Sequence, residues 1–159
     1  MVSISKGISV NDRKSIEDIL QSTGFFYDFE IEIALGLVDD TINYGAENCG
    51  YHWMRLDDDN GMVAFANYVK NAFSVHSWDL YWLAILDEYR KKHYGSLLLR
   101  EAEQRVRSLG GKVLWIETSG RPLYEPTRHF YLKNGYELEA TLREFYGPGD
   151  PKLVYRKVL

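Results

Sequence analysis

The most constraining feature of this sequence is residues 77–109, where an apolar stretch leads through a basic turn into an amphipathic segment. The stretch "SWDLYWLAIL" (77–86) is aromatic and aliphatic almost throughout, which is typical of a central β-strand. Apolar residues then recur three or four positions apart from Gly95 to Leu109, and Gly110 follows, which predicts a helix that ends there. A buried strand joined by a short turn to an amphipathic helix indicates a mixed α/β fold.

The rest of the chain supplies the other elements of such a fold. Hydrophobic periodicity and stop signals predict further helices over 11–22, 28–44 and 127–135. Further strands are predicted at 3–10, 51–56, 62–70, 112–118, 136–146 and 152–159, with Asn60-Gly61 as a hairpin-turn signal. No repeat or linker divides the chain, so we expect one mixed α/β (α+β) domain over residues 1–159, in the order β-α-α-β-β-β-α-β-α-β-β.

Composition limits the functional classes. The 159 residues are 45% hydrophobic and 26% charged, with a formal net charge of −4. This balance is typical of a globular protein and disfavours a general nucleic-acid binder, whose domain is normally basic. The single cysteine, Cys49, excludes an internal disulfide and suits a reducing compartment. Without a signal peptide or a run of about 18 apolar residues, the sequence predicts a cytoplasmic protein without membrane contact.

A basic cluster stands out against this acidic background. Arg90, Lys91, Lys92 and His93 directly precede Gly95 at the predicted helix start. The N–H groups and the dipole at a helix N-terminus attract anions, and a glycine there removes a side chain from the ligand's approach. The cluster therefore indicates either a phosphate site, to which Ser96 can add a hydroxyl donor, or a solvated helix start. Neither a Walker loop nor a GxGxxG motif is present.

Two segments carry a family resemblance. The residues Arg90, Lys91, Lys92, His93, Tyr94, Gly95 and Ser96 resemble the central Gln/Arg-x-x-Gly-x-Gly/Ala motif of the GNAT superfamily of N-acetyltransferases. The segment "TRHFYLKNGY" (127–136) is similar to the fourth-helix signature of the same superfamily. Two departures stand out: His93 replaces the first motif glycine, and Tyr124 lies where many members carry an asparagine.

The resemblance implies a fold and a chemistry. The fold is a mostly antiparallel sheet, flanked by about four helices, with a splay between the fourth and fifth strands. The donor is acetyl-CoA, the acceptor a primary amine, and transfer occurs directly in a ternary complex. The implied cofactor-binding residues are the backbone of Leu83, Ala84 and Ile85, the pyrophosphate-binding stretch Arg90, Lys91, Lys92, His93, Tyr94, Gly95 and Ser96, and the downstream residues Tyr124, Arg128 and Tyr131.

Three side chains are candidates for proton transfer. The resemblance places Tyr131 beside the coenzyme A sulfur as general acid, although an aromatic packing residue is the simpler alternative. Asp79, six residues before Ile85, matches the position of the catalytic glutamate of the histone-acetyltransferase branch, and neighbouring aromatic residues can raise its pKa by desolvation. It can equally be an exposed residue at a strand end. Glu117 is a comparable base that would act through a water molecule.

Several alternatives stay open. Cys49 as a nucleophile would need a nearby base, so a packing role is favoured, and no residue cluster has metal-ligand spacing. The aromatic residues Phe25, Phe26, Tyr27 and Phe29 either line an acceptor pocket or form a second small core, and the second is favoured. The acceptor amine is undetermined and a homodimer is possible. The rival function is a non-catalytic acyl-CoA-binding module.

Overall fold

The computed structural model describes all residues 1–159, which form two compact units. The first unit comprises residues 1–69 and 81–103, and the second comprises residues 70–80 and 104–159. One seven-stranded sheet has the strand order β1-β2-β3-β4-β5-β7-β6. Strand β4 (Ser77–Ile85) and helix α4 (Tyr94–Ser108) each contribute residues to both units.

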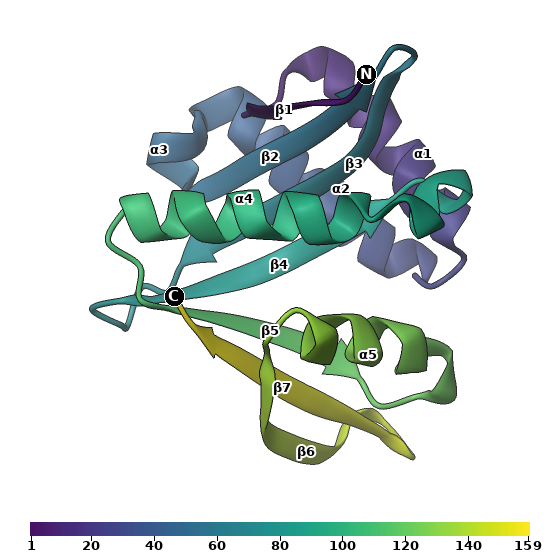
Figure 1. Cartoon of the computed structure of the whole chain (residues 1–159), viewed down its shortest axis with the longest axis vertical. Helices are drawn as coiled ribbons and strands as arrows, with labels where there is room; N and C mark the ends of the chain where they lie inside the picture. The colour runs from purple at the N-terminus through teal and green to yellow at the C-terminus, as the bar shows by residue number, and fades with distance from the viewer. The chain divides into compact units, whose positions relative to one another are not determined.

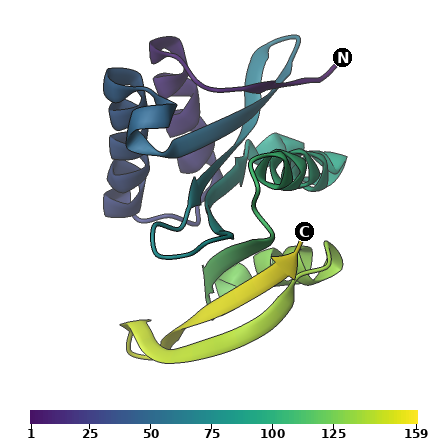
Figure 2. The same ribbon diagram turned by 90° about the vertical axis from the view of Figure 1, so that its left-hand side faces the viewer.

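The first unit is a helix–sheet–helix sandwich. Strands β1 (Ser3–Lys6), β2 (Tyr51–Asp58) and β3 (Gly61–Lys70) form an antiparallel sheet. Helices α1 (Arg13–Thr23) and α2 (Asp28–Tyr44) cover one face of this sheet, and α4 covers the other (Figures 1 and 2). The core beneath α1 and α2 includes Ile16, Leu20, Ala34, Val38, Trp53 and Phe65.

The predicted helices of this unit are confirmed, with small differences at their ends. Helix α1 follows a 3₁₀ turn at Val10–Asp12 and ends at Thr23, where it is capped by Gly24, whose φ of 68° is the left-handed conformation that glycine adopts easily. Helix α2 buries the predicted apolar face of Ile31, Ala34, Leu35 and Val38. The hairpin turn is shifted by one residue from the prediction, since Asp58 pairs with Gly61 across Asp59 and Asn60.

The second unit is built on an antiparallel ladder. Strand β7 (Asp150–Val158) lies between β5 (Val113–Ser119) and β6 (Glu137–Gly147). Helix α5 (Glu125–Lys133) follows a 3₁₀ turn at Pro122–Tyr124. Figure 2 shows the long twisted β6–β7 hairpin in yellow and yellow-green.

The parallel pairing of β4 with β5 is short. It joins Ser77–Leu80 to Val113–Ile116 and ends there, although both strands continue. This confirms the predicted splay between the fourth and fifth strands. The peptide groups of β4 after Leu80 are therefore not used in pairing with β5.

Two helical segments differ from the sequence prediction. The sequence predicts a turn at the basic cluster, whereas Asp87–Lys92 form a 3₁₀ helix, η2, before α4. A short helix, α3 (Ala46–Cys49), follows α2, so the α-helices number five rather than about four. Both additions are too short for hydrophobic periodicity to reveal them. None of the helices combines the length and the apolar character that crossing a bilayer requires.

Candidate active site

The start of α4 exposes backbone donors in the first unit. The first hydrogen bond within α4 runs from Leu97 N–H to the carbonyl of His93, at 3.2 Å. The N–H groups of Tyr94, Gly95 and Ser96 precede it, and the first turn of an α-helix leaves such groups without intrahelical partners. Three consecutive amides at a positive dipole end are suited to bind a phosphate.

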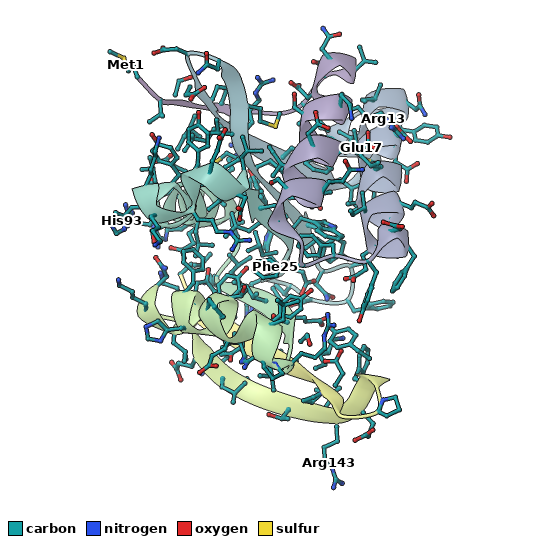
Figure 3. All side chains as sticks on the ribbon, turned by 90° about the vertical axis from the view of Figure 1, so that its right-hand side faces the viewer. Met1, Arg13, Glu17, Phe25, His93 and Arg143 are labelled. Carbon is teal, nitrogen blue, oxygen red and sulfur yellow. The ribbon has the colours of Figure 1, made fainter.

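His93 joins the 3₁₀ helix to α4 in a left-handed conformation. Its φ is 60° and its ψ is 14°, and its side chain is exposed. Figure 3 shows the labelled His93 at the beginning of α4. Glycine adopts this conformation without steric cost, which explains why glycine suits this position of the motif. The chain thus makes this left-handed turn with a β-carbon present.

The basic side chains before His93 have local partners. The Arg90 guanidinium contacts Asp87 at 2.8 Å, donates to the carbonyl of Thr23 at 2.8 Å, and lies 4.6 Å from the ring centroid of Phe25. The Lys92 ammonium lies 4.3 Å from the ring centroid of Tyr89. Cofactor binding by Arg90 therefore stays a prediction, and it would require the guanidinium to exchange these contacts. Lys91 is exposed.

The predicted pantetheine-binding stretch, Leu83, Ala84 and Ile85, forms the last three residues of β4. The Ala84 side chain is buried in the core of the first unit. This stretch lies beyond the residues of β4 that pair with β5. Pantetheine binding by the backbone groups of this stretch stays a prediction. The side chains of the stretch are apolar, so only its backbone could form such hydrogen bonds.

A polar hollow of about 240 Å³ lies in the second unit. Its lining consists of Asn71, Ser74, Ser77, Asp79, Trp115, Glu117 and Val154. Asp79 and Trp115 are direct neighbours in the β4–β5 pairing. The Trp115 indole N–H donates to the Ser77 hydroxyl at 3.1 Å, which fixes the ring in the hollow.

Asp79 has the properties of a proton acceptor. Burial raises the pKa of its carboxyl group, and the negative charge of Glu117 adds to this increase. The Asn71 amide, which donates to Asp79 Oδ2 at 3.1 Å, and the positive charge of Lys152 both lower it. Glu117 differs because its carboxylate forms an ion pair with Lys152 at 2.7 Å. Asp79 is therefore the carboxylate without a cationic partner in the hollow.

Tyr131 is part of an aromatic cluster between α5 and β7. Its ring packs against Phe130 and Tyr136 with centroid distances of 5.2 and 5.8 Å, and lies 6.4 Å from Tyr155. Burial raises the pKa of its hydroxyl, so the group stays protonated at physiological pH. The ring thus has the packing role that the sequence suggested as the simpler alternative, and the hydroxyl is in the protonation state of a general acid.

The acid and base candidates lie on opposite faces of β5. Tyr155, which contacts Tyr131, pairs with Ile116, so Tyr131 lies on the face that Ile116 shares with Thr118. Glu117 points to the other face, where the hollow lies. The Thr118 hydroxyl on the Tyr131 face is buried without a hydrogen-bond partner. Each face of the strand therefore offers a different set of polar groups to a ligand.

Tyr124 and Arg128 stabilise the segment between β5 and α5. Arg128 Nη1 donates to the carbonyls of Ser119 at 3.0 Å and Arg121 at 2.8 Å. The Arg121 guanidinium lies 5.3 Å from the ring centroid of the buried Tyr124. The structure assigns Arg128 a local stabilising role, and cofactor contacts of both residues stay predictions.

The aromatic residues that follow α1 differ in how deeply they are buried. Phe26 packs edge-to-face on Trp82 with a centroid distance of 5.1 Å, as expected for a small core. Tyr27 and Phe29 stack on each other but are 53% and 61% exposed, so they belong to no core. Cys49 lies 3.8 Å from the Thr41 hydroxyl, in agreement with a packing role.

Of the residues that line the hollow, sequence reasoning named Asp79 and Glu117 and missed the other five, among them Asn71 and Trp115, and it also missed the Lys152 partner of Glu117. Lys152 pairs with Glu117 from a strand about 35 residues away, and no local pattern reveals such a contact between strands. Trp115 was assigned only to a buried strand. Asn71 had a usable signal, because asparagine commonly forms a turn by accepting from a backbone N–H two residues on, as it does here with Phe73.

Comparisons with known proteins agree with this arrangement. The acetyltransferase (GNAT) family model matches residues 14–136. A candidate GNAT-family acetyltransferase from Desulfovibrio desulfuricans superposes with a TM-score of 0.96 at 36% sequence identity, over 99% of each chain.

Two further solved structures share the fold at lower identity. The ribosomal-protein-alanine N-acetyltransferase of Brucella melitensis has a TM-score of 0.77 at 17% identity, over 99% of each chain. The PaiA N-acetyltransferase of Thermoplasma acidophilum, solved with coenzyme A, has a TM-score of 0.75 at 18% identity, over 99% of each chain. A comparison with curated proteins finds no match. On the family model and the relative from Desulfovibrio, the chain belongs to the GNAT family of acetyltransferases.

Proposed function

We propose that this protein transfers an acetyl group from acetyl-CoA to a primary amine by direct attack of the amine. The observation that carries the proposal is Asp79, a half-buried carboxylate without an ionic partner in a polar hollow, in a chain of this family. A general base with a raised pKa is what removal of a proton from an ammonium group requires. In agreement with the single cysteine, we place the protein in the cytoplasm.

The residues present fit acetyl-CoA. The free amides of Tyr94, Gly95 and Ser96 suit its pyrophosphate, and the exposed Lys91 next to them can neutralise a further charge. The orphaned hydroxyl of Thr118 offers a partner to the amide-rich pantetheine arm. Acetyl-CoA supplies a thioester, whose carbonyl accepts the amine and whose thiolate leaves.

Proton transfer is divided between the two faces of β5. Asp79 takes a proton from the acceptor ammonium, which makes the amine nucleophilic, and the negative charge of Glu117 helps to raise the pKa of Asp79. Tyr131 donates its hydroxyl proton to the departing sulfur and recovers a proton from water, and the second proton that the nitrogen loses as the amide forms passes to water. A backbone N–H of Leu83, Ala84 or Ile85, beyond the β4–β5 pairing, stabilises the negative charge that develops on the carbonyl oxygen.

The hollow also bears on the acceptor. Its lining offers two carboxylates, one amide, two serine hydroxyls and the indole of Trp115. A carboxylate next to an aromatic face favours a cation through ion pairing and cation–π attraction. The acceptor is therefore a protonated primary amine that loses its proton only after it has bound.

Acetyl transfer to a panel of primary amines tests the proposal. The purified protein is incubated with acetyl-CoA and each amine, free thiol is measured with a chromogenic disulfide, and the product is identified by mass spectrometry. We expect thiol release that depends on the amine and a product carrying one added acetyl group. Asp79→Asn is the matched control, since it keeps the shape of the hollow and removes the base.

Binding without transfer would refute the proposal. If coenzyme A raises the melting temperature but no amine in the panel is acetylated, the protein is an acyl-CoA-binding module instead. Equal rates for the wild type and Asp79→Asn would remove Asp79 from the mechanism.

A further inference from the structure

The side chain of Asn71 has both ends fixed. One end, Oδ1, accepts a hydrogen bond from Phe73 N–H at 3.0 Å. The Asn71 backbone is held as well, because its N–H donates to the carbonyl of Ser77 at 3.0 Å. A carboxamide has its acceptor at one end and its donors at the other. Because Phe73 engages the oxygen, the NH₂ group must point away from it, and there it donates to Asp79 Oδ2 at 3.1 Å.

The loop that carries Asn71 is closed by further hydrogen bonds. Ser74 N–H donates to the carbonyl of Asn71 at 3.2 Å. The Ser74 hydroxyl accepts from the N–H groups of His76 and Ser77, at 3.3 and 2.9 Å. Residues 71–77 therefore hold the Asn71 amide in one orientation, and Asp79 follows two residues later on β4.

We propose that Asn71 is a positioning residue for acetyl transfer, which holds Oδ2 of Asp79 so that Oδ1 accepts the proton of the acceptor amine. This inference rests on the proposed function, because it gives Asp79 the part of the base. Phe73 contributes only its backbone N–H, since its side chain is fully exposed.

Asn71 also offsets the effect of burial on Asp79. The charged groups that act on Asp79 are Glu117 from β5, which raises its pKa, and Lys152 from β7, which lowers it. Lys152 is engaged by Glu117 at 2.7 Å, so the Asn71 amide is the direct donor to the carboxylate. Without that donor the protonated form of Asp79 becomes more populated at neutral pH, and a protonated carboxyl cannot act as a base.

Two substitutions separate the donor from the turn. In Asn71→Ser and Asn71→Asp the new oxygen can still accept from Phe73 N–H, so the loop is retained. Serine is too short to reach Asp79, and aspartate replaces the donor with a like charge. Phe73→Ala is the control within the loop, because it keeps the backbone N–H and removes an exposed ring. The titration of the Asp79 carboxyl is followed by carbon NMR, and kcat/KM is measured against pH.

The expected results form an ordered series. The titration midpoint of Asp79 and the acidic limb of kcat/KM move together to higher pH, by about one pH unit in Asn71→Asp and by less in Asn71→Ser. Phe73→Ala leaves both unchanged. A midpoint that is the same in all four proteins would overturn the inference and leave Asn71 as a loop residue. The NMR titration needs no turnover, so a wild type that acetylates no amine would refute the proposed function separately.

Discussion

His93 offers a direct test of how the turn before α4 is made. At φ = 60° a residue with a β-carbon is disfavoured, whereas glycine is not. The His93 side chain is exposed, and its carbonyl accepts the first hydrogen bond of α4, which any residue can provide. Replacing His93 by glycine should therefore remove a steric cost without removing a side-chain contact.

The size of the effect follows from two opposing terms. A left-handed conformation costs a residue with a β-carbon about 1–2 kcal/mol. Glycine gives the unfolded chain more freedom, which costs about 0.4–1 kcal/mol. We expect His93→Gly to be more stable than His93→Ala by about 0.5–1 kcal/mol, which for a chain of this size corresponds to about 1–4 °C in Tm. A β-branched residue suits this conformation least, so His93→Val should be the least stable.

Calorimetry or circular dichroism on the wild type and the three variants measures this order. The same proteins are titrated with coenzyme A, because the turn aligns the amides of Tyr94, Gly95 and Ser96. The affinity should be kept in His93→Gly and reduced in His93→Val. If His93→Gly melts below His93→Ala, or if all four proteins melt together, the steric argument is wrong.

Three further substitutions test the assigned roles. Tyr131→Phe should lower kcat by about 10²-fold and leave KM for acetyl-CoA nearly unchanged. This is the low end for loss of a general acid, because a thiolate leaves readily. Full turnover at every pH would show that the ring of Tyr131 only packs. Gly95→Val should weaken coenzyme A binding at least about tenfold in calorimetry, while circular dichroism shows that α4 is intact. Normal binding by this variant would mean that the phosphate group does not bind at the start of α4. Burial raises the pKa of Asp79 in the folded protein above its value in the unfolded chain. The protonated carboxyl group therefore favours the folded state below the unfolded pKa, and this contribution to stability is lost as the pH rises through the folded pKa. Asp79→Asn should therefore have a higher Tm than the wild type at neutral pH, with the difference shrinking below about pH 4, and a neutral Tm lower than that of the wild type would contradict the assigned environment.

The elements of the fold were predictable where the sequence pattern is local and long. The apolar face of α2 and the periodicity of α4 are repeated over several turns, so their boundaries were predicted to within one or two residues. The 3₁₀ helix at Asp87–Lys92 was not, because six mostly polar residues show no hydrophobic periodicity. Its consequence is that Arg90 bonds with Asp87 and Thr23.

The candidate site was predictable only in part for a related reason. Asp79 and Gly95 lie in motifs that are contiguous in the sequence. The partners that set the properties of Asp79 come from elsewhere: Asn71 from the preceding loop and Lys152 from β7. Strand pairing brings β5 beside β7, and register across a sheet is decided by the whole fold.

The central claim is that Asp79 is the base of an acetyl-CoA-dependent transfer to a primary amine. Its most direct test is kcat/KM for the best amine of the panel, measured against pH in the wild type and in Asp79→Asn. For the wild type, the account predicts that kcat/KM falls as the pH is lowered into the acidic range. For Asp79→Asn, it predicts a plateau of kcat/KM that is lower by about 10²-fold or more and that lacks this acidic decrease. An unchanged limb and plateau in Asp79→Asn would contradict it.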